Sequence, residues 1–210
     1  MKAGIVGLPN VGKSTLFNCL SDTKAQSANF PFCTIEPNHS IINVPDKRLN
    51  ILKKLVNPEK VIPATVEIVD IAGLVKGASK GEGLGNKFLA NIRETDAIIH
   101  VLRCFDNDNI THVDGTIDPV RDKEIIDIEL QLKDLEAIIN RLVKVSRSAK
   151  SGDKESISEK NVLEKAKELI ESSTNIRAID LDKDDINKFL KPLQLITAKP
   201  VLYVCNVDES

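Results

Sequence analysis

The sequence predicts an α/β fold, in which helices flank a mostly parallel β-sheet and an antiparallel helical hairpin is inserted. Short apolar segments alternate with helical segments over residues 3–103, and another apolar segment lies near the end. Between the last two apolar segments, leucines and isoleucines recur every three or four residues, which is typical of paired helices. With 210 residues, 41% of them hydrophobic, the chain is long enough for one core with an appendage.

The sheet and its helices are predicted from apolar runs bounded by glycine, proline and polar residues. We expect strands at residues 3–7, 39–44, 65–70, 97–103 and 200–205. Helices are expected at 12–20 and 86–94, and exposed loops at 22–38 and 73–85, the second because it holds five glycines.

The hairpin is predicted from a heptad-like pattern that Ser151-Gly152-Asp153 interrupts. Leu163, Ala166 and Ile170 continue a helical pattern after the break, and a third short helix is expected over 184–195. We therefore predict a core domain of residues 1–121 and 197–210 and a coiled-coil insertion of residues 122–196. The first helix of the insertion is expected to face the second through Ile125, Ile128, Leu132, Leu135, Ile139 and Leu142.

Composition argues against several classes of protein. The 29 basic and 31 acidic residues nearly balance, so there is no overall positive field and no DNA partner is predicted. No apolar run is long enough for a membrane span. The four cysteines are scattered without a CxxC pair, which argues against disulfide and zinc scaffolds and favours a reduced, cytoplasmic protein.

Residues 7–14, Gly-Leu-Pro-Asn-Val-Gly-Lys-Ser, match the GxxxxGK[ST] pattern between an apolar strand and a helix. In that context the backbone N–H groups wrap around phosphate oxygens, and the helix adds the positive end of its dipole. Lys13 would neutralise the β- and γ-phosphates, and the Ser14 hydroxyl would bind Mg²⁺. The sequence therefore predicts a P-loop NTPase fold of the Ras-like type.

Two further elements fit a nucleoside triphosphate site. Asp70-Ile71-Ala72-Gly73 ends a strand like the DxxG loop of GTPase-like folds, so Asp70 would hold Mg²⁺ and the Gly73 N–H would contact the γ-phosphate. Thr34 lies in the loop before the second strand, where it would complete the Mg²⁺ shell only with the γ-phosphate present.

The residue that would orient the attacking water is not evident. Leu74 follows Gly73 where Ras-like GTPases carry glutamine, and its side chain cannot hydrogen-bond. The three histidines are the candidates. His39 begins an exposed strand and His100 lies in the middle of a strand, whereas His112 lies in a polar loop and can point at the site.

Base specificity is expected at Asn206-Val207-Asp208-Glu209. Guanine-specific proteins carry NKxD there, and the longer Glu209 would overreach the two N–H groups of guanine. Adenine fits these residues, and Asn206 could serve either base.

Taken together, residues 7–15, 29–38, 70–89 and 206–209 resemble the Obg-like ATPase family, also called YchF, and the resemblance runs through the whole chain. It implies a coiled-coil insertion, a hydrophobic residue at the Leu74 position, ribosome association and a preference for ATP over GTP. The implied nucleotide-binding residues are Asn10, Val11, Gly12, Lys13, Ser14, Thr15, Asn206 and Val207.

The resemblance also implies cofactors and catalytic groups. Ser14, Thr34 and Asp70 would hold Mg²⁺, and Asn10 would help to hold K⁺. His112 would replace the missing glutamine, so His112, Lys13 and Gly73 are the expected catalytic groups. Family members continue past the NxxE motif into a TGS domain, whereas this chain stops one residue after Glu209. We therefore expect a truncated chain with an incomplete base pocket.

Three functions are compatible with these residues, and a fourth is weighed against them. The first is slow hydrolysis of ATP with Mg²⁺ in a switch associated with the ribosome or its RNA, and a GTP-specific GTPase is the second. The third is a nucleotide-gated binding module with negligible intrinsic hydrolysis, which Leu74 favours. The fourth, a purely structural coiled coil, is hard to reconcile with three aligned phosphate-site elements.

Overall fold

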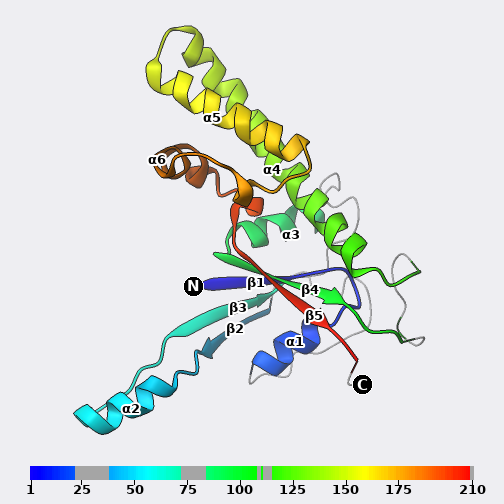
Figure 1. Cartoon of the computed structure of the whole chain (residues 1–210), viewed down its shortest axis with the longest axis vertical. Coiled ribbons are helices and arrows are strands. Elements are labelled where there is room, and N and C mark those ends of the chain that lie inside the picture. Colours follow the sequence, from blue (N-terminus) through cyan, green and yellow to red (C-terminus); the bar gives the residue numbers. More distant parts are fainter. Residues whose placement is uncertain (22–37, 72–83, 108–109, 111–114, 209–210) are drawn as a thin grey trace.

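The computed structural model describes residues 1–21, 38–71, 84–107, 110 and 115–208, and for residues 84–87 it describes the backbone alone. The predicted α/β fold is confirmed (Figure 1). The sheet contains β1 (Lys2–Val6), β2 (Asn38–Asn43), β3 (Thr65–Asp70), β4 (Ala97–Arg103) and β5 (Val201–Asn206). The helices of this part of the chain are α1 (Lys13–Leu20), α2 (Lys47–Val56) and α3 (Leu84–Arg93).

The sheet has the strand order β2-β3-β1-β4-β5. β1 pairs in parallel with β3 and β4, β4 pairs in parallel with β5, and β2 is antiparallel to β3. In this register Ile5 of β1 lies opposite Asp70, and Val6 lies opposite His100. The loop after β1 therefore leaves the sheet between the ends of two parallel strands, where α/β sheets bind ligands.

The core of the sheet is built from both of its faces. Figure 1 shows α1 on one side of the sheet and α3 on the other. Phe17 of α1 and Ile92 of α3 are buried with Ile5 and Ile98 in one cluster. Because β1 is central, its side chains are covered on both sides, which explains its continuous apolar run.

A long hairpin projects from this core. α4 (Pro119–Lys150) and α5 (Lys154–Glu171) pack against each other, joined by the predicted break at residues 151–153. Short helical turns follow at Ile176–Ala178, α6 (Lys183–Asp185), Ile186–Leu190, Lys191–Leu193 and Ile196–Ala198. A second buried cluster fills the hairpin, with Ile138, Val145, Leu163, Ala166 and Phe189 among its members.

The predicted seam of the hairpin is wrong at three of its six positions, whereas Ile125, Leu135 and Leu142 pack against the buried clusters. Ile128, Leu132 and Ile139 are 49%, 39% and 41% exposed. A buried stripe of α4 recurs every four residues from Ile126 and consists of Ile126, Leu130, Asp134 and Ile138. The pattern of apolar residues does not reveal this stripe, because Asp134 carries a carboxylate. The stripe also packs in two separate clusters rather than against one partner helix.

Asp134 connects the hairpin to the returning chain. Its carboxylate is fully buried and accepts hydrogen bonds from the Ile196 N–H (2.8 Å), the Thr197 N–H (2.7 Å) and the Thr197 hydroxyl (2.8 Å). These bonds satisfy a group that burial would otherwise make costly. They also lie where α4 passes from the sheet core to the hairpin core.

α4 takes part in both clusters. Ile126 and Leu130 pack in the sheet core together with Ile196, although all three belong to the expected insertion. Ile138 and Val145 pack in the hairpin core. We still propose residues 122–196 as the insertion, since its distal part has its own core.

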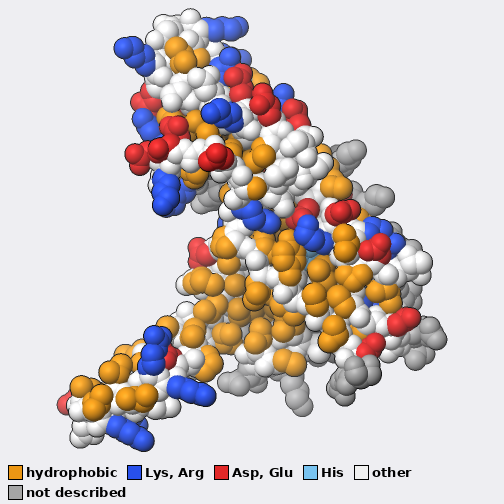
Figure 2. Space-filling view, viewed as in Figure 1, with side chains coloured by type: hydrophobic (Ala, Val, Ile, Leu, Met, Phe, Trp, Pro, Cys, Tyr) orange, Lys and Arg blue, Asp and Glu red, His pale blue; other side chains and the backbone are white. Residues whose placement is uncertain are grey.

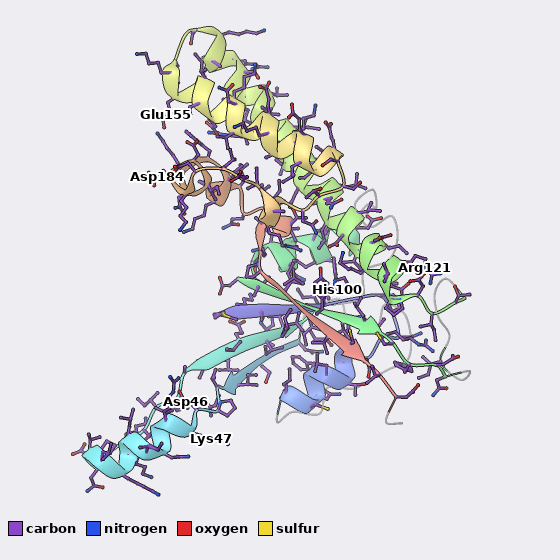
Figure 3. All side chains as sticks on the ribbon, viewed as in Figure 1. Asp46, Lys47, His100, Arg121, Glu155 and Asp184 are labelled. Carbon is purple, nitrogen blue, oxygen red and sulfur yellow. The ribbon has the colours of Figure 1, made fainter. Side chains whose placement is uncertain are left out.

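α2 was not predicted. The sequence does carry residues that commonly begin and end a helix, an aspartate at position 46 and an asparagine at position 57. In the structure Asp46 accepts a hydrogen bond from the Arg48 N–H at the start of α2, and Asn57 adopts the left-handed conformation at its end. Figures 1 and 3 show this helix, between β2 and β3, projecting away from the sheet with Asp46 and Lys47 at its base. Among the described residues, no helix is long and apolar enough to cross a bilayer.

Candidate nucleotide-binding site

The predicted phosphate loop, residues 7–12, connects the central strand β1 to α1. Gly7 is pressed against the neighbouring strand, since a Cβ there would lie 2.6 Å from the Val101 carbonyl oxygen. Leu8 and Val11 are buried and anchor the loop, whereas Asn10 is exposed and adopts a left-handed conformation with φ 62°. The loop is thus fixed at both ends, with the polar side chain of Asn10 outside.

The N-terminus of α1 differs from those of α2, α4, α5 and α6. Its N-cap is Gly12, which offers no side chain to the first N–H groups, and its first turn contains no acidic residue. Uncapped N–H groups and the positive end of the helix dipole favour an anion. By contrast, four other helices start after a capping aspartate: Asp46, Asp118, Asp153 and Asp182.

Lys13 begins α1 with its side chain buried in the loop. Its Nζ donates a hydrogen bond to the Leu8 carbonyl oxygen at 2.7 Å. Burial lowers the pKa of Lys13 to about 8, and the nearby Asp70 carboxylate partly opposes this shift. A phosphate would stabilise this ammonium more strongly than one carbonyl does, because hydrogen bonds between charged groups are the stronger ones.

Ser14 and Asp70 meet at the ends of α1 and β3. The Ser14 hydroxyl donates to Asp70 Oδ2 at 3.0 Å. Burial raises the pKa of Asp70, while the Ser14 hydrogen bond and the Lys13 charge act in the opposite direction. A buried carboxylate beside a hydroxyl oxygen fits Mg²⁺, which prefers hard oxygen ligands and keeps several waters.

Asn206 joins the end of β5 to the phosphate loop. Its side-chain amide donates to the Val11 carbonyl oxygen at 3.1 Å. A Cβ on Gly12, whose φ is +99°, would lie only 2.5 Å from Asn206 Nδ2. Gly12 is thus required both by its backbone conformation and by this close approach. Sequence reasoning expected Asn206 at the base and did not foresee this contact with the loop.

The remaining predicted residues are placed as follows. Thr15 and Val207 are exposed near the loop and the end of β5. Thr34, Gly73, Leu74, His112 and Glu209 lie outside the described residues, so their predicted roles stay predictions.

The other two histidines make their contacts within the sheet. His100 is buried beside the Tyr203 ring on β5 and near Asp127 of α4, and burial lowers the pKa of His100 to about 4 (Figure 3). His39 pairs with Glu67 at 2.8 Å on the exposed β2–β3 pair. Both contacts favour structural roles.

Sequence reasoning missed Arg103, at the end of β4. This buried side chain donates to the carbonyl oxygens of Ile110 (2.9 Å) and Asn107 (3.2 Å), and so holds the chain that leads toward His112. The Asp106 N–H also donates to Asp208 Oδ2 at 3.4 Å. Buried arginine is rare, and no local pattern marks this one.

The sheet order and the loop between β1 and α1 define a nucleotide-binding P-loop protein of the GTPase class. Residues 2–141 match the model of the family described as "50S ribosome-binding GTPase". The chain therefore belongs to this family.

Two curated relatives are named "Ribosome-binding ATPase YchF". The protein from Haemophilus ducreyi is 56% identical over 208 residues, and the one from Bacillus subtilis is 54% identical over 209 residues. The matches cover 99% and 100% of this chain and 57% of each relative. The chain thus spans little more than half the length of these relatives.

A solved structure gives the same result for the fold. It is described as "Structure of the Schizosaccharomyces pombe YchF GTPase", and it matches all of this chain and 57% of its own, with 39% identity and a TM-score of 0.79.

Proposed function

We propose that this chain is the nucleotide-binding part of a ribosome-associated switch that binds ATP in preference to GTP with Mg²⁺ and hydrolyses it slowly. The observation that carries the proposal is the buried Lys13 at the uncapped N-terminus of α1, next to the Ser14–Asp70 pair. The names of the relatives supply ribosome binding and ATPase activity, which we extend to this chain. The proposed ribosome association in turn favours a cytoplasmic location.

The residues of the loop would act by binding and orienting the triphosphate. The first N–H groups of α1 and the Lys13 ammonium would hold the phosphates. Ser14 and Asp70, with Thr34, would hold Mg²⁺, which when bound supplies positive charge to the β- and γ-phosphate oxygens. Transfer of the γ-phosphoryl group depends mainly on such positioning and charge stabilisation.

Hydrolysis needs a group that orients water, and we propose His112 for this role with the Gly73 N–H at the γ-phosphate. Arg103 supports the first assignment, because it holds the carbonyl groups of Asn107 and Ile110, which precede His112 in the chain. Asn10 at the rim of the loop is proposed to help hold K⁺. Equal hydrolysis rates in NaCl and KCl would remove the potassium assignment, and an unchanged rate in His112→Ala would remove the histidine.

Base preference is tested by parallel calorimetric titrations of ATP and GTP with Mg²⁺, with the chain extended beyond Ser210 in the manner of its relatives. Tighter binding of ATP than of GTP supports the proposal that the segment after β5 favours adenine. Tighter GTP overturns it and selects the alternative GTPase, an activity that the names of the matched family and of the yeast structure both carry.

Ribosome association is tested separately by co-sedimentation with 50S subunits in the presence of each nucleotide. We expect the chain in the pellet with a non-hydrolysable ATP analogue and in the supernatant with ADP. The same distribution with both nucleotides would contradict a nucleotide-controlled switch.

A further inference from the structure

Arg103 is a buried cation at the edge of the sheet where the nucleotide site is proposed. Lys and Arg side chains of α2 and of the hairpin stand at the surface (Figure 2), whereas Arg103, the last residue of β4, is 1% exposed. β4 lies between β1 and β5 and is parallel to both, so all three strands end at the same edge. Arg103 therefore lies at the edge from which the phosphate loop and the segment proposed for base recognition also leave the sheet.

The guanidinium of Arg103 is bound by backbone oxygens rather than by a carboxylate. It donates to the carbonyl oxygens of Phe105 (3.3 Å), Asn107 (3.2 Å) and Ile110 (2.9 Å). It also lies over the Phe105 ring, 4.6 Å from the ring centre. Among the described residues, no Asp or Glu lies within ion-pair distance of it. Since the planar guanidinium holds its donors in fixed directions, it fixes these three carbonyl groups relative to β4.

The chain that follows β4 is also bonded to the end of β5. We call its described part, residues 104–107 and 110, the β4 loop. Arg103 lies opposite Asn206 in the β4–β5 ladder, and the Cys104 N–H donates to the Asn206 carbonyl oxygen at 2.7 Å. Two residues further on, the Asp106 N–H donates to Asp208 Oδ2 at 3.4 Å. The side chain of Asn206 is in turn bonded to the phosphate loop, so the β4 loop is connected to both parts of the proposed site.

We propose that Arg103 is a positioning residue for hydrolysis, which acts by holding the β4 loop against the end of β5. The inference rests on the proposed function and deepens it, because it names the residue that keeps the hydrolytic and base-recognition parts of the site in register. The bonds of Arg103 to Asn107 and Ile110 fix the chain that precedes His112, the residue proposed to orient water. Misplacing such a group lowers the rate of the chemical step and leaves the affinity for the nucleotide unchanged.

The test is Arg103→Lys in the whole chain, with hydrolysis of Mg–ATP in single turnovers and calorimetric titration of a non-hydrolysable ATP analogue. Lysine keeps the positive charge but loses the guanidinium fork. We expect the hydrolysis rate to fall at least about tenfold, while the Kd of the analogue stays within about twofold. Exchange of the backbone amide hydrogens of residues 104–107 should become faster, because the β4 loop has lost the donor that holds its carbonyl groups.

Two further variants keep the test sharp. Asp208→Ala removes an exposed carboxylate that accepts the second bond from the β4 loop, so it tests the connection even if Arg103→Lys fails to fold. It should lower the hydrolysis rate about threefold and leave the Kd and the thermal stability unchanged. The matched control is Arg141→Lys, which breaks a two-bond contact with Glu159 in the hairpin and should change neither the rate, the Kd nor the exchange at residues 104–107.

Three outcomes would overturn the inference. They are parallel losses of rate and affinity in Arg103→Lys, as a merely structural role predicts, an unchanged rate in Asp208→Ala, and amide exchange at residues 104–107 that does not respond to Arg103→Lys. An unsubstituted chain that binds the analogue but hydrolyses no ATP would overturn the proposed hydrolysis and this inference with it. A hydrolysis rate that Arg103→Lys fully retains would overturn this inference alone.

Discussion

The phosphate loop and the helical hairpin both bury charged side chains, but they treat them differently. In the hairpin, Asp134 accepts three hydrogen bonds from within the protein. In the loop, the buried Lys13 ammonium donates to the Leu8 carbonyl oxygen, and the pKa of Lys13 is lowered. Burial perturbs both groups, since it also raises the pKa of Asp134. The difference lies in their partners: Asp134 is saturated within the fold, which is typical of structural roles, whereas Lys13 lies next to an open anion site, which is typical of functional roles.

The helix starts repeat this contrast. α4 and α5 begin after Asp118 and Asp153, whose carboxylates accept their first N–H groups, while α1 begins after a glycine. Capping aspartates stabilise a helix but repel phosphate from the same N–H groups. The hairpin therefore has ends optimised for stability, and α1 has an end left open for a ligand.

The largest effect expected from this contrast is in Lys13→Met. Removing the ammonium should weaken Mg–ATP binding about 1,000-fold, because two charge-assisted hydrogen bonds to phosphate contribute about 4 kcal/mol. Calorimetric titration measures it, with Lys47→Met on the exposed arm of α2 as the control. If Lys13→Met binds Mg–ATP within tenfold of the unsubstituted chain, the assignment of Lys13 to the phosphate site is contradicted.

The second effect is in Asp134→Ala. We expect a loss of about 3 kcal/mol in the free energy of unfolding, because buried N–H groups of Ile196 and Thr197 lose their acceptor. Urea denaturation measures the loss, and Glu136→Ala, which removes an exposed carboxylate of the same helix, should change it little. An unchanged free energy of unfolding in Asp134→Ala would show that the stability of the hairpin does not depend on the hydrogen bonds of Asp134.

A third prediction concerns pH. The folded pKa of Lys13 is about 8 and its ordinary value is 10.5, so the folded state binds fewer protons than the unfolded state between these values. Burial of the ammonium is therefore unfavourable below pH 8, and stability should rise by about 3 kcal/mol from pH 8 to 10.5 through this group. Urea denaturation across this range should show that increment in the unsubstituted chain and lose it in Lys13→Met.

The affinity for ATP should change with pH in the direction opposite to the change in stability. Since phosphates require the protonated ammonium, ATP affinity should fall above pH 8 by up to about tenfold per unit. An affinity that stays flat from pH 7.5 to 9.5 would contradict the lowered pKa.

The smallest predicted effect compares two glycines with positive φ. Gly12→Ala should reduce ATP affinity about tenfold, because its Cβ would push Asn206 from the loop. Gly152→Ala, in the hairpin turn with open space around it, should lose only about 1 kcal/mol of stability from backbone strain and no ATP affinity. Titration and thermal unfolding of both variants separate the two outcomes.

The sequence was sufficient for the sheet, because each strand is a short apolar run with clear ends, and for the phosphate loop, because its motif is local. It was insufficient where a residue acts through distant partners. Asp134 interrupts the apolar stripe of α4 and is explained only by Ile196 and Thr197, 62 and 63 residues away, so three positions of the seam were wrongly predicted. The contact between Asn206 and Val11 spans 195 residues and likewise has no local signal.

Chemical denaturation with and without Mg–ATP tests the central claim most directly, applied to the unsubstituted chain, Lys13→Met and Asp134→Ala. Mg–ATP at about 100 times its Kd should add about 2.7 kcal/mol to the unsubstituted chain. Asp134→Ala should start lower and gain the same increment, whereas Lys13→Met should start no lower than the unsubstituted chain and gain nothing. Equal gains in all three proteins would contradict the assignment of Lys13 to the ligand rather than to the fold.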